Sequence, residues 1–288
     1  MNSKNKIKFE LAIPDSYLYD VKSDIDRTAK IFQLSRSLSI FRVEKLTIYH
    51  DSLLNPTYKE REFLITILEY LDTPQYLRRK IYPKLDILKT VGRLHPLRSP
   101  HHKDKDSIRH LKSGEVRVGL LEKKGREFLV DVGLDYSLKY VGNQTQFGKK
   151  LNVKLIKQKK HLLATDPSID DLKNLFYWGY SVHYTKEFRD FIYKFEKSKV
   201  ILTSRYAKQF DGFGFVKSLI NDELVNTTLL VVFGSPKYGL KSIFEAAKID
   251  MSEYKSYNFF PSQGTQTIRM EEAIFGVLSI LNFYTQSY

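Results

Sequence analysis

The sequence predicts an α/β protein built on a parallel sheet, with a small all-β domain inserted into it. Strand-like apolar runs alternate with helical stripes over residues 1–88 and again from residue 166. Strands that alternate with helices indicate a parallel sheet covered by helices. Between these parts, over residues 89–165, short β-patterned runs separated by glycines replace the helical period. We therefore expect one discontinuous domain, residues 1–88 and 166–288, interrupted by a barrel or sandwich at 89–165.

The N-terminal part begins with two strand–helix pairs. Residues 7–13, IKFELAI, form a strand pattern that Pro14 closes, and residues 45–51, KLTIYHD, form a second strand. The helix between them is marked by apolar residues at 3-4-3 spacing, Ile31, Leu34, Leu38 and Phe41. A second apolar stripe, Phe63, Leu64, Ile67, Leu68 and Leu71, predicts a helix that ends near Pro74.

The middle part has a different composition as well as a different period. GEVRVGLLE, EFLVDVGL and KLNVKLIK are its β-patterned runs. Residues 89–165 contain 18 basic and 7 acidic residues, a net charge of +11, so only +3 of the total of +14 belongs to the other 211 residues. Five of the seven histidines also fall in this part. Such a concentrated positive field attracts polyanions, most simply nucleic acid, although a solvated lysine-rich face is the alternative.

The C-terminal part returns to the α/β pattern. Residues 199–204 and 227–234 are almost continuously apolar, as buried parallel strands are. Aromatic and aliphatic residues at helical spacing predict one helix over 188–195 and a last helix whose core face runs from Met270 to Leu281.

Three polar loops follow three predicted strands of this part: TSRY (203–206), GSPKYGL (234–240) and PSQGTQTIR (261–269). Ligands of open parallel sheets bind at the carboxyl ends of the strands. We expect Gly234, Gly239 and Gly264 to supply positive φ or close backbone approach to a ligand. Thr267 is the predicted N-cap of the last helix.

Several classes of site are excluded or disfavoured. The chain has no cysteine, which excludes disulfides, thiolate metal sites and cysteine nucleophiles. No glycine-rich dinucleotide fingerprint or P-loop follows a strand, and Asp211–Gly214 is interpreted as a turn. His101 and His102 lack partners at metal-ligand spacing, so an RNA-facing or solvated pair is expected and no metal. No apolar segment predicts a membrane span or a signal peptide, so we expect a cytoplasmic protein without membrane contact.

The stretch NFFPSQGTQTIRMEEAI (258–274) resembles the C-terminal knot motif of the SPOUT methyltransferases, N-x-x-P-x-Q-G-T-E-T-[VI]-R-T-E-E-A. Gln266 and Met270 depart from it, where Glu and Thr are common. The likeness extends to FGSPKYGL, FYWGYSV, LDTPQYLRRKIYP, RLHPLRSPHH and QLSRSLSIFRVEKLTIYHD, and so covers essentially the whole chain. The chain is most similar to the RNA uridine-methyltransferase branch, which carries an inserted OB-like barrel.

This resemblance implies a trefoil-knotted parallel sheet with helices on both faces, S-adenosylmethionine bound in the knot loops, and a homodimer. The implied function is methylation of a base, uridine N3, in ribosomal RNA. Methylation of the ribose 2′-oxygen and a non-catalytic RNA-binding scaffold that keeps the knot are the alternatives.

The resemblance also assigns site residues. Those implied for cofactor binding are Ser204, Gly234, Gly239, Phe260, Gln263, Gly264 and Thr265. Arg36 matches the arginine that SPOUT enzymes place at the reaction centre, often across the dimer interface, where it would orient a phosphate or polarise the acceptor base. Glu271, Glu272 and Arg269 are candidates for shaping the catalytic site, although Glu272 is equally suited to capping the helix.

The inserted domain is expected to bind RNA through a basic groove with aromatic stacking, as OB folds do. The basic residues expected to contact RNA are Arg93, Arg98, Lys103, Lys105 and Arg109 at its entry and Lys157, Lys159 and Lys160 at its exit. Phe128, Tyr136 and Tyr140 are the candidates for stacking on bases, and strand alternation favours a core position for Phe128.

Overall fold

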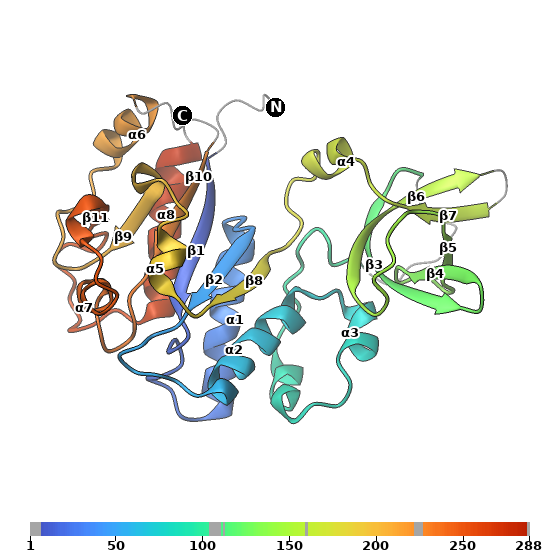
Figure 1. Cartoon of the computed structure of the whole chain (residues 1–288), viewed down its shortest axis with the longest axis horizontal. Coiled ribbons are helices and arrows are strands. Elements are labelled where there is room, and N and C mark those ends of the chain that lie inside the picture. The colour runs from blue at the N-terminus through green and yellow to red at the C-terminus, as the bar shows by residue number, and fades with distance from the viewer. Residues whose placement is uncertain (1–6, 104–110, 112, 159–160, 222–226, 287–288) are drawn as a thin grey trace. The chain divides into compact units, whose positions relative to one another are not determined.

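The computed structural model describes residues 7–103, 111, 113–158, 161–221 and 227–286 (Figure 1). The chain divides into two compact units. The first comprises Met1–Glu69, Thr90–His95 and Tyr180–Tyr288, and the second comprises Tyr70–Lys89 and Pro96–Gly179. The expected domain limits near residues 89 and 165 remain a prediction about which part of the chain folds independently.

The first unit is an α/β structure. Its strands are β1 (Lys8–Pro14), β2 (Lys45–Tyr49), β8 (Ser181–Thr185), β9 (Val200–Thr203), β10 (Thr228–Val232) and β11 (Lys255–Tyr257). Its α-helices are α1 (Asp24–Ile40), α2 (Tyr58–Asp72, whose last turn enters the second unit), α5 (Phe188–Ile192), α6 (Gly212–Asn221), α7 (Leu240–Ala246) and α8 (Met270–Gln286). Short 3-10 helices are η2 (Val91–Arg93), η4 (Lys197–Lys199) and η5 (Met251–Glu253).

The six strands form one sheet in the order β11-β9-β10-β1-β2-β8, and every neighbouring pair is parallel. This confirms the parallel sheet that the alternating pattern predicts. In β1, Leu11 pairs with Val231 of β10 on one side and with Leu46 of β2 on the other. The central strands are buried on both faces, which explains their nearly continuous apolar sequences.

Helices cover both faces of the sheet (Figure 1). On one face, α5 and α7 pack over the sheet through Phe188, Ile192 and Phe244, which belong to one buried cluster with Leu202 and Leu230. On the other face, α1 and α8 lie side by side. The stripe from Ile31 to Leu38 and the core face of α8 are fully buried, as their spacing predicts.

Several short elements of this unit do not follow from the sequence pattern. The segment Asp211–Gly214 is not a turn, because α6 begins at Gly212 and the Asp211 carboxylate accepts a hydrogen bond from the Gly214 N–H at 3.1 Å. The edge strand β8 is also unpredicted, since it has no continuous apolar run, whereas β11 lies shortly before residues 261–269, where a strand was expected.

The second unit contains a closed five-stranded barrel. Its strands are β3 (Val116–Lys124), β4 (Glu127–Asp131), β5 (Leu138–Tyr140), β6 (Lys150–Gln158) and β7 (His161–Thr165), in the order β3-β4-β5-β7-β6. The unit also holds α3 (Gln75–Ile81), η1 (Asp86–Leu88) and α4 (Ile169–Lys173). The pairs are antiparallel except for β5 with β7. The barrel core includes Leu121, Val130, Val153 and Leu155, so the predicted small all-β fold is confirmed.

Candidate functional site

Three loops leave neighbouring strands of the first unit at the same edge of the sheet. They follow β9, β10 and β11, which are adjacent and parallel, so their carboxyl ends lie together. The loop after β9 is tied to the end of β11: the Ser204 N–H donates to the Tyr257 carbonyl at 3.0 Å, and the Asn258 N–H donates to the Lys208 carbonyl at 2.8 Å. The edge is therefore the place where an α/β sheet binds its ligand.

The three loops enclose a cavity of about 340 Å³, which we call the loop cavity. Its wall consists of residues 203–206, 233–237, 239–240, 257–260, 263, 267–268, 270, 273 and 277. Five residues predicted to bind the cofactor line it, namely Ser204, Gly234, Gly239, Phe260 and Gln263. Gly264 and Thr265 do not line it, although both are exposed on the same loop.

The glycines of the loop cavity have no positive φ, and what distinguishes them is the space around each Cα. Gly239 has a φ of −70° as the N-cap of α7, and a Cβ added to it would meet no atom within 4 Å. A Cβ at Gly234 would lie 3.0 Å from the Leu240 backbone nitrogen. The left-handed conformation occurs instead at Ser262, with a φ of 57°. The expected positive φ at the three loop glycines is thus wrong, and close approach of their backbone to a ligand stays a prediction.

The loop after β11 is held by its own polar side chains. The Gln263 Nε2 donates to the carbonyls of Thr265 at 2.9 Å and Gln266 at 3.3 Å, and the Arg205 guanidinium donates to the Gln266 carbonyl at 3.0 Å. The Asn258 carboxamide oxygen accepts the Phe260 N–H at 2.9 Å. These intramolecular hydrogen bonds hold the loop in the conformation that lines the cavity.

Phe260 contributes an apolar wall that depends on a glycine in α8. A Cβ at Gly276 would lie 2.6 Å from the Phe260 ring. The ring can therefore pack against the helix backbone only because residue 276 has no side chain. The wall also includes Phe259, Met270 and Val277. The cavity thus combines apolar surface with backbone and side-chain hydrogen-bonding groups.

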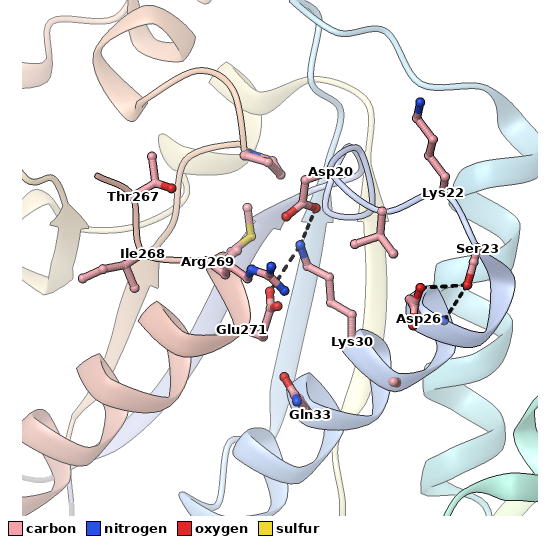
Figure 2. Close-up of a pocket in the computed structure, with 14 residues that line it drawn as sticks. Asp20, Lys22, Ser23, Asp26, Lys30, Gln33, Thr267, Ile268, Arg269 and Glu271 are labelled. Carbon is pink, nitrogen blue, oxygen red and sulfur yellow. Dashed lines mark hydrogen bonds and ion pairs between the residues drawn. The ribbon is translucent and has the colours of Figure 1, made fainter. Parts of the chain in front are cut away.

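A second cavity, of about 680 Å³, adjoins the first (Figure 2). We call it the Lys30 cavity. It is lined by residues 20–23, 26, 29–30, 33, 236 and 267–271. Four of these, Pro236, Thr267, Ile268 and Met270, also line the loop cavity. The two cavities therefore share one wall.

A buried ion cluster lies at the Lys30 cavity. The Lys30 side chain is 3% exposed, and its Nζ donates a hydrogen bond to the Asp20 carboxylate. The same Nζ lies 3.2 Å from Glu271 Oε2, and the Glu271 side chain is 8% exposed (Figure 2). The Tyr17 hydroxyl donates to the Lys30 carbonyl at 3.2 Å. Burial, with the nearby carboxylates of Glu271 and Asp20, raises the pKa of Tyr17 well above its ordinary value.

Glu271 is incompletely satisfied within this cluster. Its Oε2 is close enough to Lys30 for an ion pair, but the geometry is not that of a hydrogen bond. Among the described residues, no hydrogen bond reaches this buried oxygen. A buried carboxylate oxygen without a hydrogen bond is costly, because it has lost its water without gaining a donor.

The predicted catalytic residues occupy three different environments. Arg269 is exposed and lines the Lys30 cavity. The Glu272 carboxylate accepts the Arg269 N–H at 2.9 Å, so it caps α8, and the N-cap is Arg269 rather than the predicted Thr267. Arg36 is half-buried on α1 and lines neither cavity. The fold thus brings Arg269, but not Arg36, to the Lys30 cavity.

The sequence did not indicate that Lys30 and Asp20 belong to the site. It also did not show that Glu271 is buried beside Lys30 whereas Glu272 caps α8. A signal for Lys30 existed, since it lies four residues before Leu34 and hence on the apolar face of α1. A lysine at such a position contradicts the helical pattern and marks a site that needs a buried partner. Glu271 and Glu272 are adjacent, and only the structure shows which one faces the cavity.

The structure describes four of the eight basic residues predicted to bind RNA. Arg93 is exposed in the first unit, and Arg98, Lys103 and Lys157 are exposed in the second. Lys105, Arg109, Lys159 and Lys160 lie outside the described residues. Other lysines of the barrel are paired: Lys154 contacts Asp171 at 2.8 Å, and Lys150 contacts Asp72 at 3.4 Å.

The three aromatic residues considered for stacking on bases have different environments. Tyr136 is exposed and free to stack, whereas Tyr140 is 3% exposed and its hydroxyl donates to the Asp166 carboxylate. Burial, with that carboxylate, raises the pKa of Tyr140 to about 12. Phe128 is partly buried against the barrel core and stacks on Phe147, with ring centroids 5.5 Å apart. The expectation that Tyr140 stacks on bases is therefore wrong.

His101 and His102 are structural rather than solvated. Both Nε2 atoms donate to the Asp72 carbonyl, at 2.8 and 2.9 Å, and His101 is 1% exposed. Burial, followed by the charge of His101, lowers the pKa of His102 to about 4. The expectation of a solvated or RNA-facing pair is wrong. Across the described parts of the chain, no three histidine, aspartate or glutamate residues are grouped as metal ligands would be.

No helix among the described residues is both long enough and apolar enough to span a bilayer.

The whole chain has recognisable relatives. The sequence matches the protein family described as "Putative RNA methyltransferase" over residues 8–281. A Mus musculus protein named 28S rRNA (uridine-N(3))-methyltransferase is 28% identical over 97% of this chain and 77% of its own length. The Homo sapiens protein of the same name is 28% identical over 94% of this chain and 77% of its own length. The Drosophila melanogaster protein of the same name is 27% identical over 96% of this chain and 62% of its own length.

Proposed function

Because the chain belongs to this family of RNA methyltransferases, we propose that it methylates N3 of a uridine in large-subunit ribosomal RNA, with S-adenosylmethionine as the methyl donor. The chain is an enzyme, and the proposal concerns its donor and its target atom. The observation that carries the proposal is the loop cavity at the carboxyl edge of the sheet, with a second, polar cavity behind its wall.

The loop cavity fits an adenosyl cofactor. Its volume of about 340 Å³ is within the range of small-molecule sites. Phe259, Phe260 and Val277 supply apolar surface for a purine ring, and Ser204 and Gln263 supply polar groups at its rim. Gly239 lines the cavity, and a Cβ added to it would meet no atom within 4 Å, so a side chain can be introduced there without a clash. When bound, the cofactor would supply an electrophilic methyl group on a positively charged sulfur.

We propose that the three loops form the trefoil knot of the SPOUT fold and that the protein acts as a homodimer. The sequence motif 258–274 supports the knot, since it becomes the loop after β11 and the start of α8. The position of Arg36 supports the homodimer. This arginine lines neither cavity of its own protomer, so the role at the reaction centre that the resemblance gives it would be played from a second copy.

The barrel is proposed to be an OB-like module that holds the RNA. Five strands in a closed barrel meet the architecture of that fold. Arg98, Lys103 and Lys157 supply exposed positive charge, and Tyr136 supplies an exposed ring for stacking. Backbone phosphates would provide most of the affinity through such contacts, so binding should weaken steeply with salt.

Calorimetric titration with S-adenosylmethionine tests the cofactor assignment. We expect micromolar binding by the wild type and none by Gly239→Phe, because the new ring would stand at the lining of the loop cavity without straining a φ of −70°. Gly92→Phe is the matched control. It introduces the same side chain on an exposed 3-10 helix, where a Cβ meets no atom within 4 Å.

If the Gly239→Phe variant binds S-adenosylmethionine as tightly as the wild type, the cofactor does not bind in the loop cavity. No binding by the folded wild type, together with RNA binding, would favour the non-catalytic scaffold.

A further inference from the structure

We propose that the Lys30 cavity receives the target uracil and that Glu271 is the general base that removes its N3 proton, with Lys30 stabilising the charge that develops on the ring. This inference rests on the proposed uridine-N3 activity. It assigns a substrate site and a catalytic residue that the family resemblance left open.

The position of the cavity is the first support. The methyl acceptor must meet the donor at about 3–3.5 Å in a reactive geometry. The Lys30 cavity and the loop cavity share Pro236, Thr267, Ile268 and Met270. A base in the one and a cofactor in the other would therefore contact the same four residues, which places the two sites next to each other. With about 680 Å³, the Lys30 cavity is also the larger of the two, as a nucleotide acceptor requires.

The state of Glu271 is the second support. It is the second residue of α8, it lines the cavity, and its buried Oε2 accepts no hydrogen bond from the described residues. An ionised carboxylate is an acceptor only. Besides the Lys30 ammonium at 3.2 Å, which is not in hydrogen-bond geometry, this oxygen can accept a hydrogen bond from a ligand, and the N3–H of uracil is a suitable donor.

The neighbours of Glu271 complement the rest of the uracil edge. N3–H lies between two carbonyl groups, so a matching site needs an acceptor between two donors. Lys30 and Arg269 line the same cavity and carry donors (Figure 2). Lys30 has three N–H bonds and uses one for Asp20. Cytosine has no N3–H and would place a lone pair against the carboxylate, so this arrangement also selects uracil.

The reaction balances with these groups. The N3–H bond breaks and the proton moves to the Glu271 carboxylate, while its electron pair remains on the uracil. N3 then forms a bond to the methyl carbon of the sulfonium donor, and the electron pair of the broken carbon–sulfur bond stays on sulfur. As the negative charge spreads to the uracil carbonyls, Lys30 stabilises it. The proton on Glu271 leaves to water with the product.

Asp20 is the less suitable base. Its side chain is 33% exposed and already accepts a hydrogen bond from Lys30. Its position suits it to hold the ammonium in place, which makes it a positioning residue. The other charged and titratable groups that face the cluster are Tyr17, Lys22, Asp26 and Arg269.

Single-turnover methyl transfer by Glu271→Gln tests the proposal. The substrate is an in vitro transcript of the large-subunit rRNA of the source organism, made once with uridine and once with 5-fluorouridine. Fluorine makes the N3–H more acidic, so methylation of the modified transcript depends less on a general base. General-base catalysis contributes about 10²- to 10⁴-fold. We expect the variant to lose about 100-fold or more on the uridine transcript and to recover about tenfold relative to wild type on the fluorinated one.

Two controls separate this role from a structural one. Glu245→Gln makes the same chemical change on an exposed residue of α7 and should keep the wild-type rate. Calorimetry with S-adenosylmethionine, which needs no turnover, should give wild-type affinity for Glu271→Gln, since Glu271 does not line the loop cavity. If the Gln variant does not fold, Glu271→Asp keeps the charge, and its defect must also shrink on the fluorinated transcript.

The inference is overturned if Glu271→Gln keeps the wild-type rate, or if it is equally slow on both transcripts. A wild-type enzyme that yields no 3-methyluridine contradicts the proposed function itself, whichever rate the variant shows.

Discussion

Lys30 occupies a position of α1 where the helical stripe requires an apolar side chain, and Glu271 is buried at the start of α8. Each charge alone would cost several kcal/mol to bury. Together, and with Asp20, they form a compensated cluster next to a cavity. A buried pair of this kind is weak support for stability, and its place beside the loop cavity is what favours a role in the reaction.

A second site at the residue scale is Gly179, which has a φ of 86°. A Cβ there would overlap the Asp72 carboxylate and lie 2.7 Å from His101 Cε1. We expect Gly179→Ala to destabilise the second unit by about 3 kcal/mol, from the left-handed conformation and the overlap together. Gly125→Ala, with a φ of 63° and open space around it, should cost only about 1 kcal/mol.

Urea unfolding followed by tryptophan fluorescence measures both variants, because the single tryptophan, Trp178, lies in the same unit. Equal shifts of the unfolding midpoint would show that the overlap with Asp72 and His101 has no energetic consequence.

At the scale of elements, the sequence determines the long and strongly periodic ones. The stripes of α1 and α8 and the apolar runs of β9 and β10 all appear where the pattern puts them. The edge strand β8 was missed because an edge strand buries little and therefore carries little apolar signal. The start of α6 was missed because its glycines are typical of a turn, and only the Asp211 cap and tertiary packing make it helical.

The candidate site was predictable to the extent that it depends on strand order. Three loops after three parallel strands meet at one edge, which puts Ser204, Gly234 and Gln263 around one cavity. The Lys30 cavity was not predictable in this way. Residues 20–33 and 267–271 come together only through the packing of α1 against α8, which no local pattern encodes.

At the scale of the whole molecule, Arg36 makes the proposed homodimer testable. A heterodimer of an Arg36→Ala copy and a Gly239→Phe copy, isolated with two affinity tags, has one complete site if Arg36 acts across the interface. We expect about half of the wild-type methyl-transfer rate from this heterodimer and almost none from either parent variant. An inactive heterodimer would place Arg36 in the site of its own protomer.

The most direct test of the central claim is the identity of the methylated nucleoside. Purified protein is incubated with methyl-labelled S-adenosylmethionine and large-subunit rRNA from cells that lack the gene, and the digested RNA is analysed by mass spectrometry. We predict label in 3-methyluridine with the wild type and none with Gly239→Phe. Label in a 2′-O-methylated nucleoside, or no label with a wild type that binds the cofactor, would contradict the account.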